Sequence, residues 1–218
     1  MTEMRLGFIG GTGPEGKGLA YRFALSGHEV VIGSRSRERG EEAASEVAER
    51  VPNATVHGAE NDAAAREAEL IVLTVPFAAQ ADTLPALRET VGNKIVVSTA
   101  VPMAFDGGRA TMSSVPEGSA AQQAQALLPD ARVTAAFQNL SAAKLWDEQP
   151  LTEQDVLVCG DDAEAKEQVM ALAEQISGVR AVDGGPLASA CYVEGITVML
   201  VGINRKYKAR AGVRIVGV

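Results

Sequence analysis

The stretch FIGGTGPEGKG, residues 8–18, carries the glycine spacing of two different nucleotide-binding loops. Gly11, Gly13 and Gly16 fit the G-x-G-x-x-G pattern of dinucleotide-binding domains. Gly11, Gly16 and Lys17 also fit the first seven positions of a P-loop. The first interpretation predicts hydride transfer with a nicotinamide cofactor, and the second predicts phosphoryl transfer assisted by Mg²⁺.

The surrounding residues favour the dinucleotide interpretation. A P-loop needs Ser or Thr after its lysine to bind Mg²⁺, but Gly18 occupies that position. It also needs a later apolar strand that ends in Asp, whereas the strand LIVLTVP ends in Thr-Val-Pro. The glycine loop instead follows a predicted strand and opens a predicted helix, as a dinucleotide loop does. The pyrophosphate is then expected on the free N–H groups at the helix start.

The residues after the second predicted strand indicate which dinucleotide binds. An NAD site has Asp or Glu there, which accepts hydrogen bonds from the ribose 2′-hydroxyl. This strand ends in Ser34 and Arg35, and Arg39 follows one helical turn later. A guanidinium binds phosphate oxygens in a bidentate manner, so these residues predict NADP(H), with Thr12 as an additional hydroxyl. The alternative is a solvated basic cluster.

The usual proton donors of alcohol and ketone dehydrogenases are missing. None of the three tyrosines has a lysine four residues later, and the histidines His28 and His57 are interpreted as structural. The acids of CGDDAE, residues 159–164, are expected to cap a helix. No residue is therefore assigned a catalytic or metal-binding role. This pattern favours a hydride acceptor that is itself a redox cofactor, with catalysis supplied by ring positioning.

The elements that must position these residues alternate between strand and helix. The predicted strands cover 4–9, 28–33, 54–58, 69–76, 94–99 and 131–137, and the helices between them cover 14–26, 37–51, 61–68, 78–91 and 119–128. Such alternation predicts a Rossmann-type, doubly wound parallel α/β sheet, with the last of these strands closing it. A long loop at 100–118 is expected at the carboxyl edge, where ligands bind.

The remaining residues predict a smaller C-terminal α+β region packed beside the sheet. Its expected elements are strands at 154–160, 179–185 and 212–218 and helices at 163–177 and 187–208. We therefore divide the chain into an NADP(H)-binding domain, 1–140, and a small domain, 141–218, that completes the cleft. The apolar helix is interpreted as buried or as a subunit contact, because Glu194 near its middle disfavours a membrane span.

Composition narrows the class of protein. The net charge of −8 argues against nucleic-acid binding, and two cysteines without nearby ligands suit a cytosolic protein without a metal site. Residues 204–218 carry five basic side chains and no acidic one. This tail is either an anion site or a solvated or subunit-facing segment.

Several motifs together resemble the NADPH-dependent reductases of the deazaflavin coenzyme F-420. They are GGTGPEGKGLAYRFALSGHEVVIGSR, VLTVP, VCGDDAEAKE, GGPL and the terminal INRKYKARAGVRIVGV. The resemblance covers nearly the whole chain and implies reversible hydride transfer between the nicotinamide and the deazaflavin. In that family the two cofactors meet in a cleft between the two domains. We also expect a cytoplasmic homodimer.

The resemblance also implies the residues that contact the cofactors. These would be Thr12, Gly13, Pro14 and Glu15 at the pyrophosphate; Ser34, Arg35 and Arg39 at the 2′-phosphate; Val75, Pro76, Phe77 and Ala81 at the nicotinamide half; and Val101, Pro102, Met103, Gln138, Asn139, Leu140, Ala142 and Ala211 toward the deazaflavin. Some relatives have a His in the segment after the strand at 131–137, where this chain reads FQNLSAA. The alternatives are an NADPH-dependent reductase of an imine, a flavin or ferric iron, or a non-catalytic NADP(H) sensor.

Overall fold

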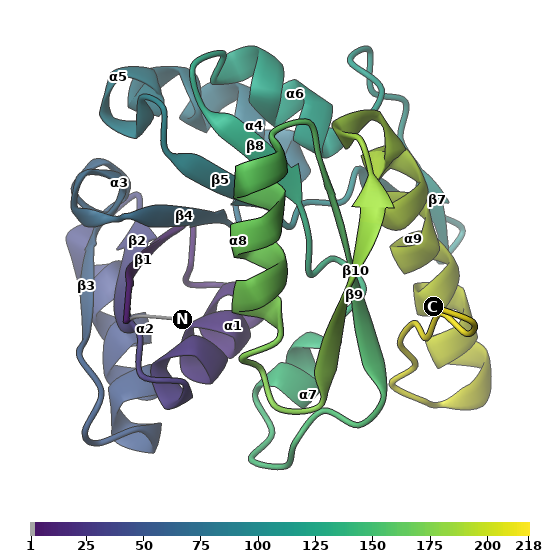
Figure 1. Ribbon diagram of the computed structural model, residues 1–218, viewed down its shortest axis with the longest axis horizontal. Helices are drawn as coiled ribbons and strands as arrows, with labels where there is room; N and C mark the ends of the chain where they lie inside the picture. The colour runs from purple at the N-terminus through teal and green to yellow at the C-terminus, as the bar shows by residue number, and fades with distance from the viewer. Residues whose placement is uncertain (1–2) are drawn as a thin grey trace.

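The computed structural model describes residues 3–218 and contains an eight-stranded sheet (Figure 1). Its strands are β1 (Arg5–Ile9), β2 (Glu29–Ser34), β3 (Val56–Glu60), β4 (Leu70–Leu73), β5 (Ile95–Ser98), β8 (Arg132–Ala135), β9 (Gln154–Gly160) and β10 (Val179–Gly185). The spatial order is β10-β9-β8-β5-β4-β1-β2-β3, and the six strands from β8 to β3 are parallel. The order of connection reverses between β1 and β4, which is where doubly wound sheets bind ligands.

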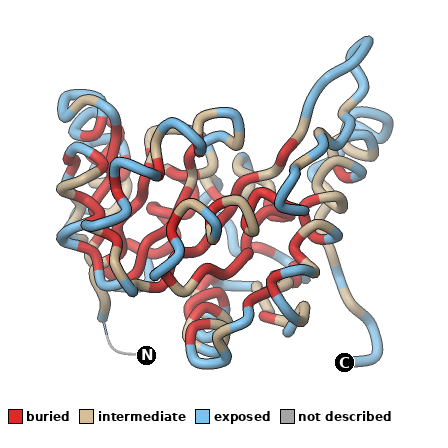
Figure 2. Tube along the Cα trace, turned by 90° about the horizontal axis from the view of Figure 1, so that it is seen from above, coloured by how far each residue is buried: buried red, intermediate tan, exposed pale blue. Residues whose placement is uncertain are grey.

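Helices cover both faces of the sheet. One face packs against α1 (Pro14–Leu25), α2 (Arg37–Arg50), α7 (Ala142–Leu145) and α8 (Ala163–Ala173). The other face packs against α3 (Asn61–Glu67), α4 (Phe77–Thr83), α5 (Arg88–Val91), α6 (Ala120–Leu127), α9 (Ala190–Tyr207) and two short 3₁₀ turns, η1 (Pro85–Leu87) and η2 (Leu187–Ser189). The buried residues accordingly occupy the middle of the molecule (Figure 2).

The strand β4 shows why the sheet needs helices on both sides. Leu70 and Val72 join one core, whereas Ile71 and Leu73 join the other. Successive side chains of a strand point to opposite faces, so a continuously apolar strand requires two apolar layers. The predicted doubly wound α/β class is therefore confirmed.

Local signals set the ends of two helices as expected. Helix α1 begins at Pro14 and ends before Gly27, whose φ of 88° suits a residue without a Cβ. Asp162 precedes α8, and its side chain accepts a hydrogen bond from the Ala165 N–H at 2.7 Å. The capping role predicted for the acids of CGDDAE is therefore confirmed for Asp162.

The segment 100–118 is not the structureless loop that was predicted. It contains a hairpin of β6 (Met103–Asp106) and β7 (Arg109–Met112), paired antiparallel. Gly107 and Gly108 form its turn with φ values of 53° and 76°, as a two-residue hairpin turn requires. Most of the hairpin side chains are exposed, so this segment has no buried apolar face. Without such a face, the sequence pattern does not distinguish a strand from a loop here.

The C-terminal region joins the sheet, so the prediction that it packs beside the sheet is wrong. Strand β9 pairs antiparallel with β8, and β10 pairs parallel with β9. The strand at 131–137 therefore does not close the sheet. Both β8 and β9 present buried apolar residues, and the edge of β8 that faces away from β5 provides the hydrogen-bonding partner that β9 needs.

The predicted strand at 212–218 does not form. The carboxylate of Asp155 accepts the Ile215 N–H at 2.6 Å, and Arg180 donates to the carbonyls of Ile215 and Val218, both at 2.6 Å. These side chains bind the backbone groups that a strand would offer to a neighbouring strand. The tail is therefore held by the Asp155–Arg180 pair rather than by a sheet.

Helix α9 lies beside the hairpin strand β7 (Figure 1), and several of its apolar side chains are exposed. The segment Leu187–Tyr207 is long and apolar enough to cross a membrane, and 28% of its most apolar window is buried. Tyr192, Met199 and Tyr207 are among its exposed side chains. Of the two interpretations, the partial burial of this helix disfavours a fully buried helix and leaves the subunit contact as a prediction.

Candidate active site

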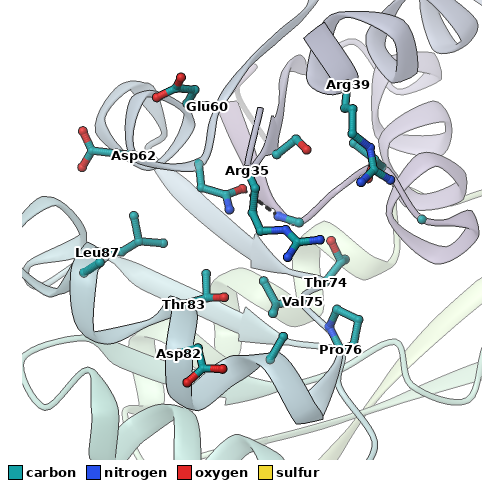
Figure 3. A pocket seen from close by; sticks show the side chains of 17 residues that line it. Arg35, Arg39, Glu60, Asp62, Thr74, Val75, Pro76, Asp82, Thr83 and Leu87 are labelled. Atoms are coloured by element: carbon teal, nitrogen blue, oxygen red, sulfur yellow. Dashed lines mark hydrogen bonds between the residues drawn. The ribbon is translucent and has the colours of Figure 1, made fainter. Parts of the chain in front are cut away.

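A cleft of about 630 Å³ lies at the carboxyl edge of the sheet, beside the β1–β4 switch point (Figure 3). Seven of the predicted cofactor-binding residues line it: Thr12, Gly13, Ser34, Arg35, Arg39, Val75 and Pro76. They come from the ends of three neighbouring strands and the elements that follow them. A parallel sheet brings these positions together, because its strands all end at the same edge.

The glycine loop is shaped by close contacts on one side and open space on the other. A Cβ on Gly16 would lie 2.6–2.8 Å from backbone atoms of Gly11, so that position has no room for a side chain. A Cβ on Gly13 would meet nothing within 4 Å. Asn61 is bound to the loop as well, because its side-chain oxygen accepts the Gly10 N–H at 3.0 Å. The loop is therefore closely packed at Gly10 and Gly16 and accessible at Gly13.

Two glycine substitutions should separate packing from cofactor binding. We expect Gly16→Ala to lower Tm by several degrees, because its methyl group would collide with the Gly11 backbone. We expect Gly13→Ala to keep Tm within about 2 °C but to weaken NADPH binding at least about tenfold, because a methyl group blocks close approach of the pyrophosphate. Thermal unfolding and NADPH titration of both variants would test this. Equal Tm losses would contradict it.

The side chains at the end of β2 create the positive part of the cleft. Ser34 is buried, whereas Arg35 and Arg39 are exposed and line the cleft. Neither of these two arginines forms an ion pair with any of residues 3–218, although Arg37 between them pairs with Glu41 at 2.8 Å. Figure 3 shows Arg35 extending toward the middle of the cleft. Two unpaired guanidinium groups beside a free hydroxyl suit a phosphate dianion.

Glu15 lies in the first turn of α1 and has an unusual environment. The residue is partly exposed, but its carboxyl oxygen Oε1 is enclosed and has no hydrogen-bond partner among the described residues. This burial raises the pKa of Glu15 to about 8. The carboxyl group is therefore protonated near neutral pH and adds no negative charge beside the expected pyrophosphate.

The raised pKa of Glu15 predicts a pH-dependent stability. The folded protein holds this proton between about pH 4.5 and 8, where the unfolded chain releases it, so stability falls as pH rises through this range. Glu15→Gln removes the titration and should stabilise the fold by about 1–2 kcal/mol at pH 8.5, with little effect at pH 4.5. Thermal unfolding across this range measures the difference. A Tm difference that does not change with pH would contradict it.

The other predicted site residues lie outside the cleft. Pro14 and Glu15 begin α1, and Phe77 and Ala81 lie on α4, whose residues Ala79, Asp82 and Thr83 line the cleft instead. Val101, Pro102 and Met103 lead into the hairpin, and Gln138, Asn139 and Leu140 follow β8. Ala142 starts α7, and Ala211 donates its N–H to Asn204 Oδ1 at 2.7 Å near the end of α9. Their roles remain predictions.

The residues after β8 form a strained turn, Phe137–Leu140. Phe137 is buried and has a φ of 74°, which costs a bulky residue on the order of 1–3 kcal/mol. The turn closes with a hydrogen bond from the Leu140 N–H to the Phe137 carbonyl at 3.0 Å. Gln138 Nε2 donates to the Ser98 carbonyl at 3.0 Å, while its Oε1 is buried and has no hydrogen-bond partner within residues 3–218. Strain of this kind persists only where surrounding contacts hold it.

Sequence reasoning missed the far end of the cleft. Its additional lining residues are Gly10, Glu60, Asn61, Asp62, Thr74, Ala79, Asp82, Thr83, Ala86 and Leu87. Glu60 and Asp62 lie opposite Arg39 across the cleft (Figure 3). Glu60 ends β3 and Asn61 and Asp62 follow it, so the same strand-end rule that located Ser34 and Arg35 could have found them.

The fold and the cleft define a nicotinamide-dinucleotide-binding α/β oxidoreductase. The accessible Gly13, the free N–H groups at the start of α1 and the unpaired Arg35 and Arg39 fit a dinucleotide that carries a 2′-phosphate. This fit rests on the shape and charge of the residues present. It agrees with what the comparisons with known proteins show.

The chain belongs to the F-420-dependent NADP reductases. Residues 5–102 match the family model described as coenzyme F-420-dependent NADP oxidoreductase. The chain is 42% identical to the F-420-dependent NADP reductase of Methanocaldococcus jannaschii, over 97% of this chain and 98% of that protein. The reductase of Methanothermobacter thermautotrophicus is also 42% identical, over 97% and 94%. The chain is therefore an oxidoreductase that uses NADP(H) and coenzyme F-420.

A solved structure supports the same fold assignment. It is described as a candidate F-420-dependent NADP reductase from Arthrobacter, with 27% identity and a TM-score of 0.85. The match covers 98% of this chain and 100% of that one. The resemblance inferred from the sequence motifs is therefore confirmed at the level of family and fold.

Proposed function

We propose that this chain transfers a hydride reversibly between NADP(H) and the deazaflavin ring of coenzyme F-420. The observation that carries the proposal is the pair of unpaired guanidinium groups, Arg35 and Arg39, at the end of β2 in a chain of this family. Ser34 and these two arginines would hold the 2′-phosphate. The N–H groups at the start of α1 would hold the pyrophosphate.

The protein's own contribution would be positioning rather than proton transfer. When both cofactors are bound, the nicotinamide and the deazaflavin supply the hydride donor and acceptor. Val75 and Pro76 line the end of the cleft after β4 and would orient the nicotinamide half. The Phe137–Leu140 turn would carry the second ring. Placing two rings at reacting distance can supply much of the rate enhancement without an acid or base.

We also propose a cytoplasmic homodimer built on α9. The exposed apolar side chains Tyr192, Met199 and Tyr207 lie along this helix, and Phe105 of the neighbouring hairpin is exposed as well. A second copy of the chain would cover these groups, since apolar patches of this kind mark contact sites. In this arrangement residues 141–218 would act as the part that completes the cleft and forms the subunit contact.

Mixing the protein with NADPH and coenzyme F-420 tests the proposal. The visible absorbance of the oxidised deazaflavin should bleach in step with oxidation of NADPH, and NADP⁺ added to the reduced deazaflavin should restore it. A reaction without protein provides the control. If NADPH binds but neither direction proceeds, the acceptor is wrong, and an imine, a flavin or ferric iron would be tested next.

A further inference from the structure

We propose that Thr197 is a positioning residue whose hydroxyl holds the Phe137–Leu140 turn in its strained conformation. This inference rests on the proposed function, which places the turn beside the second ring. Thr197 belongs to α9, lies outside the cleft and carries no role in the sequence-based assignment. It would therefore act on the reaction through the turn rather than by touching a cofactor.

One oxygen atom of Thr197 connects two residues of the turn. Its hydroxyl donates to the Gln138 carbonyl at 2.9 Å and accepts from Asn139 Nδ2 at 2.9 Å. A carbonyl oxygen can only accept, so the hydroxyl proton points to Gln138 and the lone pairs face Asn139. Asn139 Nδ2 also donates to the Val193 carbonyl at 2.9 Å. The turn is therefore attached to α9 by both its backbone and a side chain.

Helix α9 is itself fixed independently of the turn. Glu194 is fully buried and accepts the N–H groups of Ala120 and Ala121, at 2.9 and 3.1 Å, at the start of α6. Glu194 and Thr197 are three residues apart, so both lie on the side of α9 that faces the body of the protein. Helix α9 is therefore anchored to the body of the protein by contacts that do not involve the turn.

The opposite side of the turn is attached to β5 through the Gln138 side chain, which donates to the Ser98 carbonyl. Contacts on both sides of the turn thus hold Phe137 at its unfavourable φ. Loss of the Thr197 hydroxyl would free the Gln138 carbonyl and allow the peptide to rotate. Hydride transfer depends steeply on ring placement, since a shift of about 1 Å can cost a rate factor on the order of one hundred.

Thr197→Val and Thr197→Ser form a matched pair, because only the second retains the hydroxyl. In the cofactor-free protein, hydrogen exchange of the Leu140 amide should be at least about tenfold faster in Thr197→Val and within about threefold in Thr197→Ser. In single-turnover mixing, hydride transfer should fall at least about tenfold in Thr197→Val only. The Kd for NADPH should stay within about twofold in both, because its binding residues lie elsewhere.

Three results would overturn the inference. They are unchanged exchange in Thr197→Val, equal impairment of both variants, and faster exchange with unchanged hydride transfer. If the unaltered protein does not reduce coenzyme F-420, the proposed function fails instead. The exchange measurement still decides whether Thr197 holds the turn, so the two failures are distinguishable.

Discussion

Replacing Arg35 with Glu should raise the Kd for NADPH by about two orders of magnitude and change the Kd for NADH by less than about threefold. The guanidinium of Arg35 lines the cleft and has no ion-pair partner among the described residues. Its loss would remove charge-assisted hydrogen bonds to the 2′-phosphate, each worth about 1.5–3 kcal/mol. The new carboxylate would also repel the phosphate. NADH has no such phosphate and should be affected little.

Arg37→Glu provides a matched control for this experiment. It changes the net charge by the same amount two residues away, but Arg37 already pairs with Glu41 and does not line the cleft. Its effect on NADPH binding should be several times smaller, since exposed charges are screened by salt. Fluorescence titration with both nucleotides measures the constants. Equal weakening of NADPH and NADH by Arg35→Glu would refute the 2′-phosphate assignment.

The largest expected stability loss comes from Arg22→Met. Arg22 is 4% exposed, and its guanidinium donates to the carbonyls that end α7 and the following segment. These bonds reach Leu145 at 2.7 Å, Lys144 at 2.8 Å, Asp147 at 2.6 Å and Gln149 at 2.8 Å. Removing the donor would leave four carbonyl groups without this partner. We expect a loss of about 3–5 kcal/mol, or about 10 °C in Tm.

Arg88→Met tests whether loss of any arginine has this effect. Arg88 pairs with Asp130 at 3.9 Å, and both side chains are more than half exposed. Exposed pairs contribute about 0–1 kcal/mol, so Tm should fall by no more than about 2 °C. Thermal unfolding of the two variants side by side makes the comparison. Similar losses would show that the four carbonyl contacts of Arg22 do not stabilise the fold as argued.

The glycine loop and the basic end of the cleft could be predicted because each is marked by a short run of neighbouring residues. The glycine loop and the Ser34–Arg35 pair follow single strands, and a parallel sheet gathers strand ends at one edge. The signals for β6 and β7 are also short, but most of the hairpin side chains are exposed and provide no apolar alternation. The sequence pattern of residues 103–112 therefore predicts a loop.

The sequence by itself determined the doubly wound fold and the position and charge of the basic end of the cleft, formed by Ser34, Arg35 and Arg39. These depend on apolar runs, glycine spacing and residues that follow strands, all of which are local patterns. Only the tertiary structure decided that β9 and β10 extend the sheet, that Asp155 and Arg180 hold the tail, and that Arg22 anchors α7. It also revealed the positive φ of Phe137 and its attachment to Thr197. These features join residues far apart in the chain, so their contacts leave no spacing pattern in the sequence.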